Sequence, residues 1–189
     1  MIDIPDITLI GSGAAATTTL IELFLMLLAN PLKGNILNIS VVEKHPEFWK
    51  GIPYGSRSSL NSLTITAVSD FISNGKEREL FLSWLKKNHN HWTYYYRENG
   101  GLAAKIWLEK NLPLLENNEW HAVYLPRFVF GVYMHDKMLN LLKMVEEKKL
   151  VQLTLIQAEA IDVSPKDTYY DVKLESPEKR ISNLKTKKL

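Results

Sequence analysis

The 189 residues are enough for one domain, and a hydrophobic content of 46% is enough to bury a core without disulfide or metal crosslinks. The 23 basic and 21 acidic side chains leave a net charge of +2 and are spread along the chain, which excludes the basic stripe of a nucleic-acid-binding or anionic-membrane-binding protein. The chain has no cysteine, which excludes a disulfide framework, a thiolate metal site and a cysteine nucleophile, and fits a reducing, cytoplasmic location.

The first elements predict a β-α-β unit. Residues 6–10 are β-branched and apolar and end at a glycine, which is typical of a buried parallel strand. Residues 14–29 predict a helix, and residues 36–43 a second strand that ends in Glu43. The apolar part of the helix, residues 20–29, is too short for the ~20 residues of a membrane span and contains Glu22, and the N-terminus lacks the early Lys or Arg of a signal peptide.

The middle of the chain predicts a loop followed by an inserted helical lobe. Residues 45–69 are rich in Gly, Pro, Ser, Asn and Thr, so we expect an ordered loop that runs over a site. Apolar residues at helical spacing return in residues 77–87 and near 102–112. Between these helices, the aromatic residues of 89–96 fill the core of the lobe or form a contact surface for a flat substrate or a partner.

The last third predicts a helix and short strands. Residues 124–130 lead into a helix over roughly 132–149, and strand-like runs follow at 150–157, 158–163 and 169–175. Residues 178–189 are polar and basic and indicate a solvated tail.

These elements together predict an α/β fold: a Rossmann-like parallel sheet with an inserted helical lobe and a short β hairpin or meander near the C-terminus. We expect one domain over residues 1–189, incomplete, with four parts. These are the β-α-β unit and loop (1–70), the helical insertion (71–122), the helix and strands (123–177) and the basic tail (178–189).

The turn between the first strand and the first helix carries the chemistry. Its residues, Gly11, Ser12, Gly13, Ala14, Ala15 and Ala16, fit the G-x-G-x-x-G/A pattern in its required strand-turn-helix context. Gly11 allows the tight turn, Gly13 lets a pyrophosphate approach the backbone, and Ala16 keeps the helix close to the sheet. Glu43 is placed to accept hydrogen bonds from an adenosine ribose, although it follows Ala16 at more than the usual ~20 positions.

Two other interpretations of this turn stay open. Small residues can pack such a corner without binding a ligand, and an S-adenosylmethionine-dependent methyltransferase also uses a glycine turn and an acid after its second strand. The methyltransferase site has no pyrophosphate that would require the compact first turn.

Four further segments resemble the FAD-NAD(P)-binding protein family, bacterial flavoproteins similar to flavin-dependent N-hydroxylating monooxygenases. A Gly-rich stretch ending in Tyr is matched by FWKGIPYG, and a Leu-Leu-Asn-like element by Ser59-Leu60-Asn61. A Phe-Leu-x-Trp-Leu helix is matched by FLSWL, and an aromatic-x-Pro-Arg segment leading into Gly-x-Tyr by YLPRFVFGVY. The resemblance covers residues 7–133 well and residues up to 175 more loosely.

This resemblance implies an FAD-binding fold and a redox role. By analogy, Gly11, Gly13, Ala16 and Glu43 hold the ADP half of FAD. Three further residues, Gly55, Asn61 and Arg127, lie on the isoalloxazine or pyrophosphate side. For these three, ordinary structural roles are equally open: a turn for Gly55, a local backbone hydrogen bond for Asn61 and a surface ion pair for Arg127. The resemblance identifies no catalytic residue.

The chain departs from the family after residue 175. Flavoproteins of this kind continue into a strand with an Ala-Thr-Gly-like turn that closes the FAD site, and often into a nicotinamide domain for NAD(P)H; neither follows here. We therefore expect an N-terminal half or a subunit, with two functional hypotheses: an FAD-dependent oxidoreductase of the monooxygenase type, completed by further chain, or a non-catalytic Rossmann module that pairs with a partner chain.

Other residues indicate no further chemistry. His89 and His91 lack a third metal ligand at convincing spacing, so we expect no metal site. The serines have no recognisable His and acid partners of a hydrolytic triad, and His135 is interpreted as structural.

Overall fold

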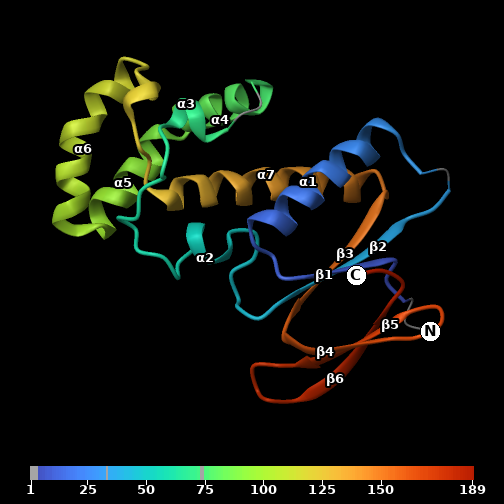
Figure 1. Cartoon of the computed structure of the whole chain (residues 1–189). Coiled ribbons are helices and arrows are strands. Elements are labelled where there is room, and N and C mark those ends of the chain that lie inside the picture. Colours follow the sequence, from blue (N-terminus) through green and yellow to red (C-terminus); the bar gives the residue numbers. More distant parts are fainter. Residues whose placement is uncertain (1–3, 33, 73–74) are drawn as a thin grey trace. The chain divides into compact units, whose positions relative to one another are not determined.

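The computed structural model describes residues 4–32, 34–72 and 75–189 (Figure 1). The chain divides into two compact units, which are described separately. The first unit contains Met1–Gly51 and Met134–Leu189, and the second contains Ile52–Tyr133. The long helix α7 (Arg127–Glu147) begins in the second unit and ends in the first.

The first unit is built on a parallel sheet in the order β1-β2-β3. Strand β1 (Ile7–Ile10) leads through α1 (Ala14–Ala29) to β2 (Leu37–Glu43), and α7 leads into β3 (Val151–Gln157). Because β2 pairs with a strand on each side, its last five residues are all buried. The predicted Rossmann-like α/β fold is confirmed.

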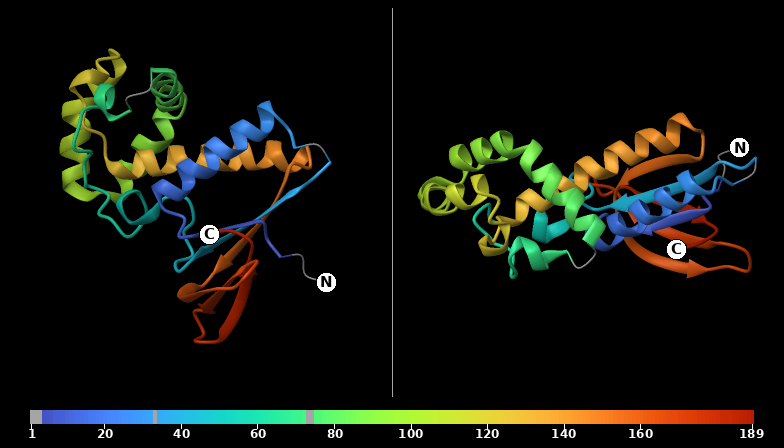
Figure 2. Two further views of the ribbon diagram at one scale, coloured as in Figure 1. Left: turned by 45° about the vertical axis from the view of Figure 1, so that its right-hand side comes forward. Right: turned by 90° about the horizontal axis from the view of Figure 1, so that it is seen from above.

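The sheet is the middle layer of this unit. Helices α1 and α7 lie on one face, and an antiparallel meander lies on the other (Figure 2). The meander consists of β4 (Glu159–Pro165), β5 (Tyr170–Glu175) and β6 (Ile181–Thr186). Val42 from β2 packs with Ala158, Val172 and Leu174 in a buried apolar cluster, which joins the two sheets.

The prediction of a solvated tail over residues 178–189 is wrong, because Ile181–Thr186 forms strand β6. All six residues pair in register with β5, from Ile181 opposite Glu175 to Thr186 opposite Tyr170. Leu184 packs against the apolar cluster, while its neighbours are exposed. The polar composition therefore reflects an edge strand with one face in solvent.

The second unit is helical. It contains α3 (Val68–Phe71), α4 (Gly75–Lys87), α5 (His89–Asn99), α6 (Gly101–Glu116) and the 3₁₀ turn η1 (Trp120–Ala122), with the short α2 (Gly51–Tyr54) at its boundary. The predicted helices over 77–87 and 102–112 are present within α4 and α6. The segment 89–96, to which no helix was assigned, is most of α5, and it buries Trp92 and Tyr96 while Tyr94 and Tyr95 are exposed.

Aromatic rings form the core of the second unit. Phe130 contacts the rings of Tyr54, Phe71, Phe81 and Tyr133 at centroid distances of 4.7–6.0 Å, mostly edge to face. Such contacts between aromatic rings stabilise a small unit beyond the area that they bury.

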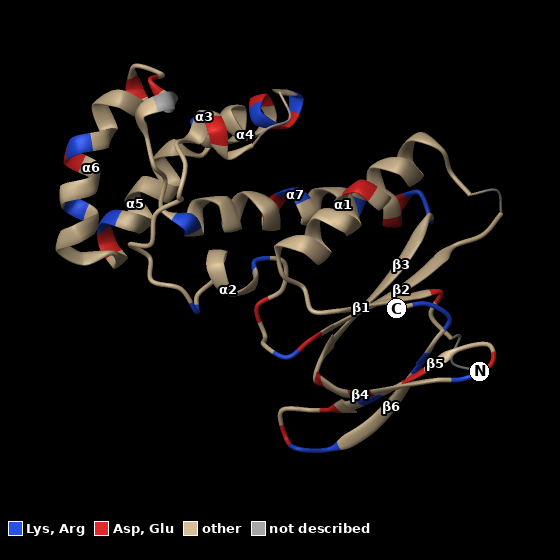
Figure 3. Ribbon diagram, viewed as in Figure 1, with Lys and Arg blue, Asp and Glu red and all other residues tan. Residues whose placement is uncertain are grey.

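In the described part of the chain, charged residues of both signs are interspersed over the ribbon of both units (Figure 3). Among the described residues, the structure contains no helix that is both long and apolar enough to cross a membrane.

Candidate functional site

The glycine turn lies where the chain leaves β1 and enters α1. Gly11 has φ = 89°, a left-handed conformation that glycine adopts without steric cost, and its N–H donates to the Val42 carbonyl at 2.7 Å. Gly13 follows in an extended conformation at the N-cap of α1. The turn thus continues the β1–β2 pairing by one residue and then starts the helix at the carboxyl end of the sheet, where ligands of α/β folds bind.

Glu43 anchors this turn from the end of β2. Its Oε2 accepts hydrogen bonds from the Ser12 backbone N–H at 2.8 Å and from the Ser12 hydroxyl at 3.0 Å, and its Oε1 accepts the His45 N–H at 3.1 Å. Both Ser12 and Glu43 are buried. The structure therefore brings Glu43 together with the turn, where it holds Ser12; its predicted contact with a ribose remains a prediction.

A second loop packs directly on the turn; it belongs to residues 45–69, for which the sequence predicts an ordered loop over a site, although neither Trp49 nor Gly51 is among the predicted site residues. Thr17 in α1 donates to the carbonyls of Ser12 and Trp49, at 3.2 and 3.3 Å. Trp49 is buried with φ = 75°, which is rare for a bulky residue and indicates strain that the surrounding packing maintains. Two sequence signals cover this loop: the Gly- and Pro-rich composition of residues 45–69 and the stretch FWKGIPYG.

The two loops meet at Gly13 and Gly51. A Cβ on Gly51, where φ = 65°, would lie 2.9 Å from the Gly13 Cα, so the fold itself requires glycine there. A Cβ on Gly13 would meet only the Gly51 Cα, at 3.8 Å, which is an ordinary contact. Among the described residues, no atom thus excludes a Cβ at Gly13, which leaves space beside it for a ligand.

The N-terminus of α1 is open to an anion. No side chain caps this end, and the first turn contains no acidic residue. Ala14, Ala15 and Ala16 are at least partly exposed. The positive end of the helix dipole thus has neither a capping side chain nor an acidic residue in the first turn of α1, although the Glu43 carboxylate lies beside it at Ser12; this arrangement fits a phosphate group.

The other three predicted site residues belong to the second unit, where each has a structural contact. The Gly55 carbonyl accepts the Ser58 N–H at 3.2 Å in a turn. Asn61 accepts the Tyr96 hydroxyl at 3.0 Å and donates to the Gly100 carbonyl at 3.1 Å, and thus holds the end of α5. Arg127 donates from Nε to the Leu63 carbonyl at 2.8 Å, instead of to a surface carboxylate.

No group of three or more His, Cys, Asp or Glu side chains in the described ranges could hold a metal ion. His89 and His91 both lie in α5, where the His89 ring contacts Trp92 edge to face at 5.7 Å.

Comparison with known proteins agrees with this geometry. The sequence pattern of the FAD-NAD(P)-binding family matches residues 8–183, which include the glycine turn, Glu43 and the second unit. An uncharacterized protein of Mycobacterium tuberculosis and one of Mycobacterium bovis are each 38% identical over 169 residues. These residues are 89% of this chain but 32% of each relative, so the chain spans about a third of the length of the curated relatives that it matches.

Two solved structures share the fold. The reduced form of ornithine hydroxylase (PvdA) from Pseudomonas aeruginosa has a TM-score of 0.51 at 13% identity, over 97% of this chain and 37% of that one. The lysine monooxygenase NbtG from Nocardia farcinica has a TM-score of 0.51 at 11% identity, over 95% of this chain and 41% of that one. Both are similar in fold to this chain.

Proposed function

This chain belongs to the FAD-NAD(P)-binding family, and we propose that it is the FAD-holding part of a flavin-dependent oxidoreductase of the monooxygenase type. The family match covers nearly the whole chain and confirms the expected cofactor class, FAD and NAD(P). We further propose which half of the cofactor each residue binds and which class of reaction the protein supports.

The observation that carries the proposal is the space above Gly13. A Cβ at this position would make only an ordinary contact, so the packing of the described residues does not itself require glycine there. The adjoining α1 N-terminus presents N–H groups without a capping side chain. A pyrophosphate satisfies both features, because its oxygens accept these N–H groups and it needs a backbone without a Cβ to approach closely.

In this proposal the residues divide by role. Gly11, Ser12, Gly13, Ala14, Ala15 and Ala16 hold the pyrophosphate and adenosine side of FAD. Glu43 fixes the turn through Ser12 and accepts the ribose hydroxyls. Gly55, Asn61 and Arg127 act on the isoalloxazine or pyrophosphate side. When bound, the flavin supplies the redox chemistry, while the protein binds and orients it. The substrate, and any use of NAD(P)H through a further or separate domain, belong to the larger enzyme.

The test is titration of the purified chain with FAD, followed by quenching of flavin fluorescence. We expect saturable binding with one FAD per chain. Gly13→Ala should weaken it about tenfold or more, and Gly13→Val should abolish it, because each fills the space that the pyrophosphate needs.

Gly75→Ala is the matched control, since Gly75 has ordinary φ, starts α4 in the second unit and has open space around its Cβ position. It should leave FAD affinity unchanged. If the wild-type chain shows neither flavin absorption bands nor FAD binding, the oxidoreductase proposal fails; if Gly13→Val binds FAD normally, the site is misplaced.

A second candidate function is a non-catalytic subunit that pairs with a partner chain, and the edge of β1 favours it. The Lys187 N–H donates to the Pro5 carbonyl and the Thr8 N–H to the Lys188 carbonyl, at 3.0 and 2.9 Å, so residues after β6 begin to run alongside β1. Ile10, further along β1, is half exposed. A strand from another chain could extend this sheet edge.

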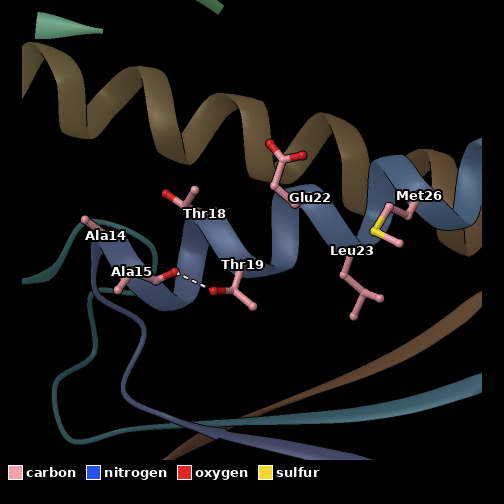
Figure 4. A pocket seen from close by; sticks show the side chains of 7 residues that line it. All are labelled: Ala14, Ala15, Thr18, Thr19, Glu22, Leu23 and Met26. Atoms are coloured by element: carbon pink, nitrogen blue, oxygen red, sulfur yellow. Dashed lines mark hydrogen bonds between the residues drawn. The ribbon is translucent and has the colours of Figure 1, made fainter. Parts of the chain in front are cut away.

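The exposed face of α1 supports the same candidate. An open groove of about 720 Å³ runs along it and is almost entirely apolar, with Glu22 as its charged residue (Figure 4). The residues drawn there are Ala14, Ala15, Thr18, Thr19, Glu22, Leu23 and Met26. Met26, which is 66% exposed, adds accessible apolar area to this groove.

Sedimentation of the purified chain separates the two candidates. A stable monomer that binds FAD tightly would contradict an obligate partner. The subunit function would be supported if the wild-type chain does not bind FAD and associates or aggregates, and if Met26→Lys suppresses that association.

A further inference from the structure

Thr17, on the buried face of α1, makes hydrogen bonds that a helical threonine does not usually make. Its side chain is fully buried, and its hydroxyl donates to the carbonyls of Ser12 and Trp49, at 3.2 and 3.3 Å. Both distances are longer than most O–H···O bonds, as expected for one proton shared between two acceptors. Thr93, a buried threonine in α5, instead donates within its own helix, to the His89 carbonyl four residues earlier at 2.7 Å. Thr17 therefore joins α1 to two segments outside the helix.

These two segments are the loops that meet at the proposed FAD site. Ser12 lies within the glycine turn, and Trp49 lies in the loop that reaches Gly51. The Ser12 hydroxyl also accepts the Trp49 N–H, at 3.4 Å. Two buried hydroxyls, on Ser12 and Thr17, thus hold both backbone groups of Trp49. They account for its φ of 75°, a conformation that a bulky residue rarely adopts without such support.

A carbonyl that is held in place also fixes the N–H group that follows it. In a planar trans peptide the C=O and the next N–H point in opposite directions. Because the carbonyls of Ser12 and Trp49 both point at the Thr17 hydroxyl, the N–H groups of Gly13 and Lys50 point away from it. Gly13 and Lys50 are half-buried, and neither N–H group donates to an acceptor among the described residues. Both donors are therefore available to an anion beside Gly13.

We propose that Thr17 is a positioning residue for the cofactor. Its hydroxyl holds the loop of residues 47–51 on the glycine turn, and thereby sets the direction of the Gly13 and Lys50 N–H groups that bind the pyrophosphate. The identity of the ligand rests on the proposed function, whereas the hold on the loop is a property of the chain alone. Thr17 acts through the backbone of the two loops, because its own side chain is fully buried.

The test repeats the FAD titration on three variants. Thr17→Val replaces the hydroxyl by a methyl group of similar size, and we expect it to weaken FAD binding about tenfold, the effect of one typical hydrogen bond. Thr17→Ser keeps the hydroxyl and should bind FAD within about twofold of the wild type. Thr93→Val is the matched control, because it removes a buried helical hydroxyl from the second unit, and its FAD affinity should equal that of the wild type. Circular dichroism checks that each variant is folded; if Thr17→Val is not, Thr17→Ala takes its place.

Hydrogen exchange without FAD tests the hold on the loop by itself. The Trp49 amide is buried and bonded to the Ser12 hydroxyl. In Thr17→Val we expect it to exchange about tenfold faster, because the loop opens more often. Thr17→Ser and Thr93→Val should keep the wild-type rate at this amide. The Val41 amide, in the middle of β2, is the internal reference and should keep its rate in all variants, whereas a general loss of stability would speed both amides.

The two measurements separate this inference from the proposed function. If the wild type binds FAD but Thr17→Val binds it as tightly, or Thr17→Ser as weakly as Thr17→Val, the inference is overturned and the proposed function stands. If the wild type binds no FAD, the proposed function fails and the role toward the cofactor fails with it, while faster exchange at Trp49 still supports the hold on the loop. An unchanged rate at Trp49 in Thr17→Val, or equal acceleration at Trp49 and Val41, overturns the inference in either case.

Discussion

Glu43 is a buried carboxylate whose two oxygens receive three hydrogen bonds from Ser12 and His45. In Glu43→Gln one oxygen becomes an NH₂ group, which then faces either Ser12 or His45, both of which donate. We expect the free energy of unfolding to fall by about 1–3 kcal/mol, the usual cost of a buried donor without an acceptor. Urea unfolding followed by circular dichroism measures it.

Glu22→Gln, on the exposed face of α1, is the control and should change the unfolding free energy by less than about 0.5 kcal/mol. Equal losses in the two variants would show that Glu43 does not hold the turn.

Tyr133 provides a pH-dependent contribution to stability in the second unit. Burial raises the pKa of this phenol, and the hydrogen bond that its hydroxyl donates to Glu77 Oε1 at 2.5 Å raises it further. A folded-state pKa above the unfolded value of about 10 means that the folded chain holds this proton longer, so stability is fully present below pH ~10 and falls above it.

Tyr133→Phe tests this. We expect it to lose about 1–3 kcal/mol of unfolding free energy at pH 7 and to make the decline above pH ~10 shallower, as urea unfolding at a series of pH values would show. Tyr94→Phe, at an exposed position on α5, should keep the wild-type stability at pH 7. If the stability of Tyr133→Phe falls above pH ~10 as steeply as that of the wild type, Tyr133 is not the source of this pH dependence.

At the level of elements, the sequence predicted the helices and strands whose local residue pattern matches their packing in the folded chain. The strands β1 and β2 are rich in apolar and β-branched residues, because helices and the meander cover both faces of the sheet, and turn residues mark the ends of α1. In α5, the residues HNHWTYYYREN have low helix propensity, and the helix forms because Trp92, Thr93 and Tyr96 are buried together. Strand β6 depends on pairing with β5, which no local pattern encodes.

Strand β6 gives a prediction at this scale. Leu184 lies opposite Val172 and packs on the cluster that joins the two sheets, whereas Asn183 points to the exposed side. Leu184→Asp should therefore lower the unfolding free energy by at least about 2 kcal/mol, because it places a charge against apolar side chains. Asn183→Asp should change it by less than about 0.5 kcal/mol. Equal, small effects in a urea titration would mean that the segment behaves as the solvated tail that its composition suggested.

At the level of the whole molecule, the sequence predicted only the local half of the site. The glycine turn is contiguous and its context is fixed by the flanking strand and helix, so it could be identified by pattern. The loop at Trp49 and Gly51 contacts the turn through its backbone. In the sequence, a contact of this kind is marked only by a glycine. The sequence could not decide between the alternative roles of Asn61, because its hydrogen-bond partners, Tyr96 and Gly100, are distant along the chain.

Hydrogen exchange with and without FAD would show how far the site extends over the chain. FAD at about one hundred times its Kd adds about 2.7 kcal/mol to the stability of the state that binds it, so amides at the site should exchange more slowly. We expect protection of the glycine turn, of the first turn of α1 and of the loop at Trp49. If Gly55, Asn61 and Arg127 also act on the isoalloxazine or pyrophosphate side, their segments gain protection in the same experiment, and Gly13→Val loses both sets together. Protection confined to the second unit, with the glycine turn unchanged, would place the FAD site elsewhere.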